Sequence, residues 1–367
     1  MFRYILYLMI FLLLVTAACE QPVSEPTAPD EVAELEEADT QPVPDGARTV
    51  IAQNLDIPWE IAKVEDTIYI SERNGSIVTI NGDEQVRKPV KFDRPLAEQA
   101  EAGLLGIAFP KDFNETKTAF AYYSYQKNNG NYQRIVTIEE TEKQWKETSI
   151  LLDEIPGGTY HHGGRIEISP DDKLFIAIGD ASNPDSAQNK NSLAGKILRM
   201  NSDGTVPDDN PFSGSYVFSY GHRNPQGLAW GPNGELYATE HGNQAHDEIN
   251  QIQAGNNYGW PVIEGDQTEE GMESPLLHSG EETWAPSGMA YYQGDFYFAS
   301  LRGEGLRKFD PIKLKQDLIV SDVGRVRDVL AIDGGVYIIT NNTDGRGNPT
   351  ENDDQLIFIP IPDNQLH

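Results

Sequence analysis

Charged, imidazole and amide side chains occupy a recurring position in this chain, immediately before or after short apolar segments. Six of them could form one chemical site: His161, Asp180, Arg223, Arg302, Arg325 and Arg327. Guanidinium groups form forked, charge-assisted hydrogen bonds with carboxylates and phosphates. If these side chains converge, they predict a site for a small polyanionic molecule. The alternative is that each arginine neutralises a neighbouring carboxylate and holds a loop in place.

The apolar segments beside these side chains repeat along the chain. Each repeat has an apolar strand, a turn rich in Gly, Asp or Asn, and a second strand that carries an aromatic residue. The repeats begin near Asp56, Gly103, Gly164, Gly227, Gly288 and Asp328. Short strands in units of roughly 40–60 residues are typical of a β-propeller. We therefore expect an all-β fold, namely a six-bladed β-propeller of four-stranded antiparallel blades.

A propeller would explain how residues far apart in the sequence could form one site. The loop before each innermost strand and the loop after each second strand open at the same end of the central channel. Besides the six residues above, these loops carry Glu101, Asn224, Gln226 and Thr283. We therefore expect all of them at one mouth of the channel.

The N-terminal residues 1–18 have the features of a signal peptide. Arg3 precedes an apolar run over residues 4–15, which is too short to span a membrane. Cys19, the only cysteine of the chain, follows two alanines, as at the cleavage site of a bacterial lipoprotein. We expect Cys19 to be lipidated; the alternative is an ordinary signal peptide whose cysteine is incidental.

Residues 19–47 are expected to form a disordered tether. From residue 20 onward this stretch contains nine acidic residues, five prolines and no Lys or Arg, so it cannot bury enough apolar surface to fold. The predicted protein is an exported cell-envelope lipoprotein. Its folded domain, residues 48–367, would be held at a membrane surface on the periplasmic or extracellular side.

The chain is strongly acidic, with 58 Asp and Glu against 28 Lys and Arg and a formal net charge of −30. This charge argues against nucleic acid and against anionic lipid as electrostatic partners. It is compatible with the binding of cations, but it identifies no substrate.

Five motifs resemble one enzyme family. They are His-His-Gly-Gly-Arg at 161–165, Gly-His-Arg-Asn-Pro-Gln-Gly at 221–227, Glu-Ile-Asn at 248–250, Asn-Tyr-Gly-Trp-Pro at 257–261 and Arg-Val-Arg-Asp at 325–328. In this order and spacing they resemble the soluble glucose/sorbosone (aldose sugar) dehydrogenases, which use pyrroloquinoline quinone (PQQ). The resemblance covers about residues 55–358.

The resemblance implies three catalytic residues. His161 would be the general base that takes the proton from the anomeric hydroxyl of the sugar while hydride passes to PQQ. Asp180 would hold the imidazole ring and stabilise its protonated form. Arg223 would lie beside the reactive carbonyl of PQQ, where negative charge develops. His162 is the alternative base, and His222 is expected to be a packed structural residue.

The resemblance also implies contacts with PQQ. Asn224 and Gln226 would supply amide contacts. The residues matched to the carboxylates of PQQ are Thr283, Arg302, Arg325 and Arg327. Arg302 stands where the family commonly has lysine, and Glu101 stands where sugar-oxidising members have glutamine. Beside a trianionic ligand, Glu101 must either be protonated, with a raised pKa, or be neutralised by Arg73 or another cation.

Two calcium sites are implied in the same way. The backbone carbonyls of Gly242 and Asn243 would hold the ion that bridges to PQQ, with Asp247 nearby. Glu248 and Tyr258 would belong to a second, structural site, unless they are simple turn residues. Oxygen ligands of this kind suit calcium.

The expected function is therefore the PQQ- and Ca²⁺-dependent oxidation of aldose sugars, or related hydroxy-aldehydes, at the anomeric carbon. The expected partners are a sugar substrate and an electron acceptor that the sequence does not name. The alternative is a non-catalytic lipoprotein that uses the mouth of the channel to bind a saccharide, a metabolite or a partner. Four tryptophans are assigned to the core between blades: Trp59, Trp230, Trp260 and Trp284.

Overall fold

The computed structural model describes residues 48–98 and 100–362. The chain divides into two units, residues 1–39 and residues 40–367, and everything below concerns the described part of the second unit. The predicted signal peptide, the lipidated Cys19 and the tether at 19–47 lie outside the described residues. Within the described ranges, no helix has the length and apolar character needed to cross a membrane.

The described part of the chain is almost entirely β-structure, as the repeats predict. Four sheets have four strands each. The first has β1 (Thr49–Ala52), β24 (Leu356–Pro360), β23 (Gly335–Thr340) and β22 (Val326–Ile332). The second has β10 (Ile166–Ile168), β11 (Lys173–Ile178), β12 (Lys196–Asn201) and β13 (Val217–Tyr220). The third has β14 (Pro225–Trp230), β15 (Leu236–Glu240), β16 (Glu248–Ile252) and β17 (Leu277–His278). The fourth has β18 (Pro286–Tyr292), β19 (Asp295–Ser300), β20 (Gly305–Asp310) and β21 (Lys315–Val320).

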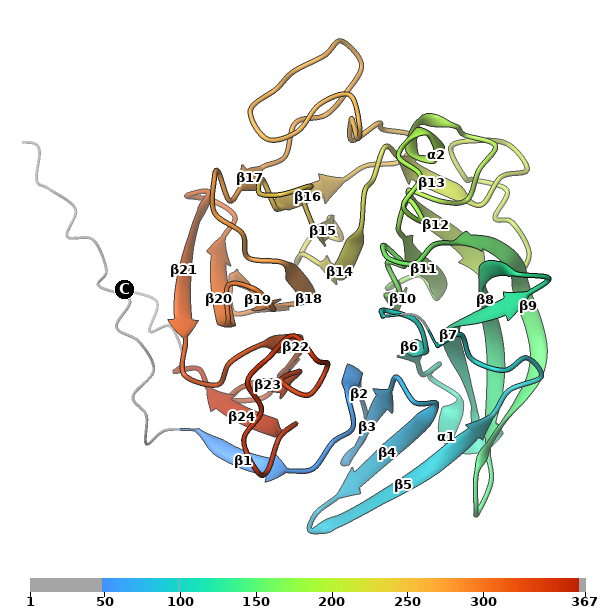
Figure 1. The fold of residues 1–367 in the computed structure, drawn as a ribbon, viewed down its shortest axis with the longest axis vertical. Coiled ribbons are helices and arrows are strands. Elements are labelled where there is room, and N and C mark those ends of the chain that lie inside the picture. Colours follow the sequence, from blue (N-terminus) through green and yellow to red (C-terminus); the bar gives the residue numbers. More distant parts are fainter. Residues whose placement is uncertain (1–47, 99, 363–367) are drawn as a thin grey trace, which may run out of the picture. The chain divides into compact units, whose positions relative to one another are not determined.

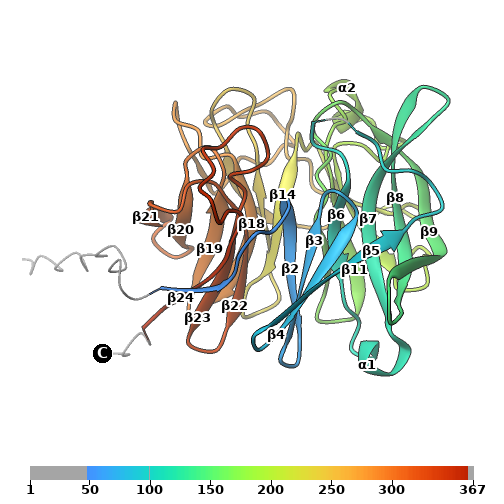
Figure 2. The same cartoon turned by 60° about the horizontal axis from the view of Figure 1, so that its bottom comes forward.

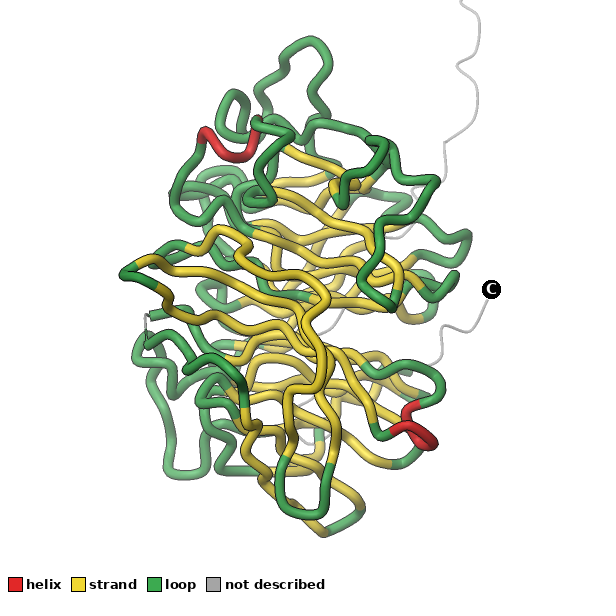
Figure 3. The backbone as a smooth tube through the Cα atoms, turned by 90° about the vertical axis from the view of Figure 1, so that its right-hand side faces the viewer, coloured by secondary structure: helices red, strands yellow, loops and turns green. Residues whose placement is uncertain are grey.

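The remaining sheet has eight strands and consists of two antiparallel halves. One half has β2 (Pro58–Val64), β3 (Thr67–Glu72), β4 (Ser76–Asn81) and β5 (Glu84–Lys91). The other has β6 (Leu104–Ala108), β7 (Thr118–Lys127), β8 (Gly130–Glu140) and β9 (Trp145–Gly157). A short parallel pairing of β5 with β9, at Val90 with Trp145 and Lys91 with Lys146, joins the halves. Two four-residue helices, α1 (Phe113–Thr116) and α2 (Asp185–Gln188), lie in loops at opposite ends of the strands (Figures 2 and 3).

The sheets surround a common centre, an arrangement consistent with a β-propeller (Figure 1). Strands β2, β6, β10, β14, β18 and β22 lie nearest the centre. The first residue of each of these strands lies within two residues of a predicted repeat start. The first strand β1 pairs with the last strand β24, through Thr49 with Phe358 and Val50 with Ile357, so the two ends of the described chain share a sheet.

The hydrophobic core lies between neighbouring sheets. One cluster joins Tyr69 of β3 to Leu104 of β6 and Trp145 of β9, and comparable clusters lie between the other neighbours. All five residues of β6 are buried, since the strand is covered on both faces. This burial explains why the inner strands are nearly continuous in apolar residues rather than alternating. Loops gather at both ends of the strands (Figure 3).

Candidate functional site

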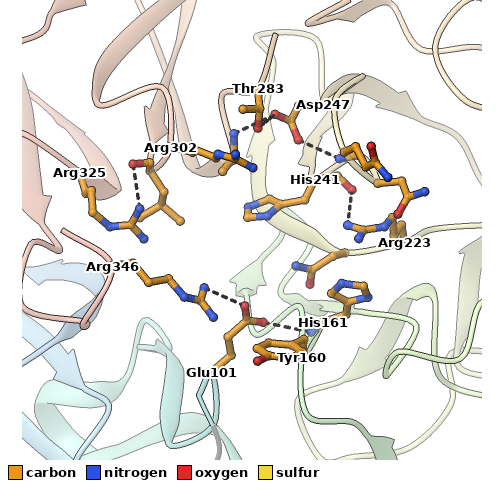
Figure 4. Close-up of a pocket in the computed structure, with 16 residues that line it drawn as sticks. Glu101, Tyr160, His161, Arg223, His241, Asp247, Thr283, Arg302, Arg325 and Arg346 are labelled. Atoms are coloured by element: carbon orange, nitrogen blue, oxygen red, sulfur yellow. Dashed lines mark hydrogen bonds and ion pairs between the residues drawn. The ribbon is translucent and has the colours of Figure 1, made fainter. Parts of the chain in front are cut away.

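A cavity of about 440 Å³ lies among the loops predicted to form the mouth of the channel (Figure 4). Its lining includes predicted site residues from loops before inner strands and after second strands. They are Glu101, His161, Arg223, Asn224, Gly242, Asn243, Asp247, Thr283, Arg302 and Arg325. A smaller space shares Glu101 and His241 with this cavity and is lined by Gln226 and Arg327. Loops from distant parts of the chain therefore bring these residues together, as expected from the repeats.

His161 and Asp180 form a hydrogen-bonded pair. His161 Nδ1 lies 2.7 Å from Asp180 Oδ1, and the aspartate side chain is fully buried while that of His161 is 21% exposed. The indole N–H of Trp260 donates to the other oxygen of Asp180 at 2.9 Å. The backbone N–H of Ser182 also donates to Asp180 Oδ1, at 2.8 Å. These three hydrogen bonds fix the carboxylate and leave Nε2 as the ring nitrogen of His161 that does not contact Asp180.

Trp260 differs from its predicted role. The sequence assigned it to the core between blades, but it is only partly buried and holds Asp180. The guanidinium of Arg223 also lies 5.3 Å from the centre of its ring, a cation–π contact. Trp260 therefore supports two site residues at once. Trp59 and Trp284 are buried, as expected for core residues.

His162 is oriented differently from His161. It is buried, its Nδ1 lies 3.2 Å from the hydroxyl of Ser124, and its backbone carbonyl accepts a hydrogen bond from Tyr122. Burial lowers the pKa of His162 to about 4, so the ring is neutral at physiological pH. It does not line the larger cavity. Of the two adjacent histidines, only His161 faces the space where a substrate could bind.

The two positions after the histidines require glycine, because other atoms of the protein lie too close for a side chain. Gly163 has φ +65°, and a Cβ there would lie 2.3 Å from the carbonyl oxygen of Ala177. Gly164 has φ +106°, and a Cβ there would lie 2.7 Å from the ring of Trp59. Side chains are excluded at both positions. The motif at 161–165 therefore turns the chain sharply and presents His161 at the cavity wall.

The predicted arginines have different partners. Arg325 forms an ion pair with Asp344 at 2.8 Å. Arg327 is buried and donates to Gln226 at 2.8 Å and Asn341 at 3.1 Å. Among the described residues, no side chain forms a hydrogen bond or ion pair with the exposed guanidinium of Arg302. The alternative, that each arginine neutralises a neighbouring carboxylate, thus holds for Arg325 but not for Arg302 or Arg327.

Glu101 is neutralised by a cation that the sequence did not single out. Its Oε1 lies 3.0 Å from Nη1 of Arg346, and its Oε2 accepts a hydrogen bond from the backbone N–H of His161 at 3.0 Å (Figure 4). Burial by itself raises the pKa of Glu101, but these two contacts outweigh burial and hold the pKa below its ordinary value. Of the two possibilities left open by the sequence, the structure favours neutralisation. Arg73 instead donates to the backbone carbonyls of Ala100 and Ala102.

The loop at 242–247 contributes Gly242, Asn243 and Asp247 to the lining of the cavity. Gly242 N donates to Asp247 Oδ1 at 2.8 Å, and a Cβ on Gly242 would lie 1.9 Å from the carbonyl oxygen of Ala245. Asp247 Oδ2 accepts from Thr283, Trp284 and Ala285. The Asp247 carboxylate is therefore occupied in shaping the loop. Within the described ranges, the Gly242 and Asn243 carbonyls accept no hydrogen bond, and no group of three or more His, Cys, Asp or Glu could hold a metal.

Glu248 and Tyr258 lie outside the cavity. Glu248 accepts a hydrogen bond from Asn250 at 3.1 Å. Burial, followed by the charge of Glu240, raises the pKa of Glu248 to about 8. The Tyr258 hydroxyl donates to the Gln251 carbonyl at 2.6 Å, and its ring stacks on His222 at 4.8 Å. These two residues, predicted to belong to a separate structural calcium site, do not line the cavity.

The prediction that His222 is structural is confirmed. It is buried, and its two ring nitrogens lie 2.8 Å from Glu240 and 2.8 Å from Ser219. With both nitrogens occupied, the ring is not available to a substrate.

The cavity lining includes residues that the sequence analysis did not single out, among them Tyr160, His241 and Arg346. His241 directly follows β15. Burial lowers its pKa to about 4, and its Nε2 is buried without a hydrogen-bond partner. Tyr160 precedes the predicted base. Arg346 lies in the long loop after β23, and that loop contains no motif that would have identified it.

Comparisons with known proteins found similar sequences and similar structures. A family model described as Glucose / Sorbosone dehydrogenase matches residues 55–349. An uncharacterised protein of Synechocystis sp. is 32% identical, over 90% of this chain and 91% of its own length. An aldose sugar dehydrogenase of Escherichia coli is 29% identical, over 81% of this chain and 90% of its own length. The solved PQQ-bound aldose sugar dehydrogenase of Streptomyces coelicolor is similar with a TM-score of 0.80 and 33% identity, covering 87% of this chain and 99% of that one.

Proposed function

Because this chain belongs to the glucose/sorbosone dehydrogenase family, we propose that it oxidises an aldose sugar, or a related hydroxy-aldehyde, at the anomeric carbon with PQQ as electron acceptor. One observation carries the proposal: His161, paired with buried Asp180, stands in the wall of a cavity that three predicted arginines also line. The cavity volume, about 440 Å³, lies in the range of small-molecule sites. A proton acceptor and an anion-binding wall thus face the same space.

In this proposal His161 removes the proton of the anomeric hydroxyl. Its Nδ1 is held by Asp180 at 2.7 Å, so Nε2 is the nitrogen that accepts the proton. The imidazolium that forms is stabilised by the adjacent carboxylate, which the Trp260 indole keeps in place. Because Asp180 is fully buried, its charge acts on the ring with little screening by water.

The residues around the cavity suit a planar polycarboxylate. When bound, PQQ would supply the two-electron oxidant that takes hydride from the sugar. Arg302, Arg325 and Thr283 would hold its carboxylates, and Arg223 would face its reactive carbonyl. Arg327 donates a hydrogen bond to Gln226, and both line the smaller space. We therefore assign them a structural role next to the site. The Nε atoms of Arg223 and Arg327 are buried and have no hydrogen-bond partner among the described residues.

We assign a calcium ion to the loop at 242–247. The carbonyl oxygens of Gly242 and Asn243 are the ligands this chain would provide, while Asp247 holds the loop rather than the ion. Backbone oxygens of this type suit calcium. The ion would add positive charge at the cavity wall, where an anionic cofactor is expected.

A second, structural calcium would involve Glu248 and Tyr258. The Tyr258 hydroxyl is already used by Gln251 and Gln253, so its ligand would be the backbone carbonyl. That carbonyl accepts no hydrogen bond from the described residues. Glu248 would contribute its carboxylate from the start of β16.

We count six blades by treating the two halves of the eight-stranded sheet separately. Among the described residues, the strand pairing between these halves is limited to two residue pairs of β5 and β9. Hydrophobic clusters support this count, because one of them lies between these halves, as between every other pair of neighbouring sheets in the described chain.

We further propose that residues 1–18 are removed on export and that lipid on Cys19 anchors the protein, with 19–47 as the tether. This part of the proposal rests on the sequence motif alone. Mass spectrometry of the mature N-terminus tests it: a diacylglyceryl group on Cys19 is expected, and a free N-terminus at another residue would contradict it.

Reconstitution tests the enzymatic proposal directly. Purified cofactor-free protein should shift the PQQ absorbance when calcium is present and should then reduce a dye with an aldose. Binding of PQQ without dye reduction would favour a different substrate. Failure to bind PQQ at any calcium concentration would favour the non-catalytic binding protein instead.

A further inference from the structure

We infer that Arg346 is a positioning residue of this site, which acts through Glu101 on the backbone of His161. The inference rests on the proposed function, because it concerns the same base and the same anionic cofactor. It adds a contact that the motifs did not predict, between Glu101 and Arg346.

Three loops from distant parts of the chain meet at this contact (Figure 4). Glu101 lies between β5 and β6, His161 between β9 and β10, and Arg346 between β23 and β24. Arg346 Nη1 lies 3.0 Å from Glu101 Oε1, and His161 N lies 3.0 Å from Glu101 Oε2. One carboxylate thus bridges the cation and the backbone of the proposed base.

His161 needs to be held because its backbone is strained. Its φ is +63°, in the left-handed region that non-glycine residues rarely adopt. The carboxylate of Glu101 accepts the only hydrogen bond that the His161 N–H donates. On the other side of the residue, Ala181 N donates to the His161 carbonyl at 3.3 Å. A shift of this backbone would move the ring away from the substrate, and small displacements cost large factors in rate.

Arg346 also contacts the residue before the base. Its guanidinium lies 5.8 Å from the centre of the Tyr160 ring. Its side chain is 45% exposed, against 23% for Glu101, so the ion pair lies at the solvent side of the carboxylate. Arg346 therefore closes the outer side of the loop that carries His161.

The charge of Glu101 matters because the cavity is expected to hold an anion. Uncompensated, this carboxylate would repel the cofactor. The other groups that face or influence Glu101 are Arg73, His161, His162, His241 and Arg327, with Asp344 lining the same smaller space. Arg346 is the cation in direct ion-pair contact with it. Loss of Arg346 should therefore leave Glu101 with a higher pKa and, once ionised, with a charge that opposes the cofactor.

The test is a PQQ titration at constant calcium, read as quinone absorbance, from about pH 5.5 to about pH 8.5. It compares the wild-type protein with Arg346→Gln, Arg346→Lys, Glu101→Gln and the Glu101→Gln/Arg346→Gln double variant. The quantity of interest is the ratio of each Kd to the wild-type Kd at the same pH, which cancels the titration of other groups. Lys111→Gln, which removes an exposed ion pair with Asp172 at 2.7 Å, is the matched control.

For Arg346→Gln we expect the Kd ratio to rise about tenfold with pH, as Glu101 ionises beside the anion. Arg346→Lys and the double variant should give a flat ratio, because the charge is kept or the carboxylate is absent. Glu101→Gln should bind PQQ more tightly at every pH, since the wild-type carboxylate is already ionised. A flat ratio near one for Arg346→Gln would overturn the charge argument.

A second readout does not need the cofactor. In ¹H–¹⁵N spectra of the apo-protein, the imidazole signals of His161 should change in Arg346→Gln and Glu101→Ala, and should be retained in Glu101→Gln, whose amide oxygen can still accept the His161 N–H. Unchanged His161 signals in Glu101→Ala would overturn the positioning role. If no protein binds PQQ, the proposed function fails while these spectra still decide whether Arg346 and Glu101 position His161.

Discussion

Arginines occur in two settings in this molecule, and their partners distinguish the two. Arg165, at the centre near the inner strands, is buried and forms ion pairs with Glu60 at 3.0 Å and Asp328 at 3.0 Å, and it stacks on Trp59 at 4.6 Å. Arg302, at the cavity, is exposed and has no side-chain partner within the described ranges. The same residue type therefore serves the fold in one region and remains available to a ligand in the other.

In the buried network, both carboxylates accept further hydrogen bonds from the backbone. Glu60 also accepts the backbone N–H of Ile107 at 2.8 Å, and Asp328 accepts that of Ile61 at 2.7 Å. These residues come from both halves of the eight-stranded sheet and from the sheet that contains β22, so the network ties inner strands together. At the cavity, by contrast, hydrogen-bonding capacity remains unused. Charged side chains that are paired with one another indicate a structural role, whereas charged side chains without a partner indicate a binding role.

The largest effect is expected from His161→Ala. Loss of the general base should lower turnover by about two to four orders of magnitude. PQQ affinity should stay nearly unchanged, because the base acts on the sugar. Dye-reduction kinetics and PQQ titration of the same preparation measure both quantities. His162→Ala is the comparison: if it abolishes turnover while His161→Ala does not, the base is wrongly assigned.

Arg165→Met tests the buried ion pairs of Arg165 with Glu60 and Asp328. The substitution leaves the buried carboxylates of Glu60 and Asp328 without their cation, which should cost about 3–5 kcal/mol of unfolding free energy. Urea unfolding measures this loss. Arg302→Met serves as the control, since removal of an exposed arginine should change stability by less than about 0.5 kcal/mol. Equal losses in the two variants would remove the distinction between the regions.

Removal of calcium should lower activity through the proposed site at 242–247 and stability through both proposed calcium sites. An ion that binds only the folded state at a hundred times its Kd adds about 2.7 kcal/mol. EDTA should therefore lower both the melting temperature and the activity, and added calcium should restore them. If EDTA changes neither the melting temperature in differential scanning fluorimetry nor the rate of dye reduction, the proposal that this protein binds calcium is wrong.

The smallest effect is expected from Arg302→Gln. One charge-assisted hydrogen bond to a PQQ carboxylate would be lost, which should weaken PQQ binding about tenfold. The melting temperature of the apo-protein should not change, because Arg302 forms no hydrogen bond or ion pair with a described side chain. A fall in melting temperature with unaltered PQQ affinity would move Arg302 into the structural class with Arg165.

Much of the fold could be predicted from local sequence. Turn residues and strand patterns act over a few positions, and each innermost strand begins within two residues of a predicted repeat start. Propeller topology then brought Glu101, His161, Arg223 and Arg302 to one cavity. Local patterns did not reveal the pairing of β5 with β9, which depends on how two neighbouring sheets meet.

The sequence by itself determined the repeated strands, the loops that carry chemistry and the family to which the chain belongs, because these depend on residue types at short and regular spacing. Only the tertiary structure decided that His161 faces the cavity while His162 is buried, that Trp260 holds Asp180, and that Arg346 neutralises Glu101 across 245 positions. The physical reason is that these contacts join loops whose conformations, including the positive φ of His161, are set by packing against other blades. No periodicity in the chain encodes such contacts.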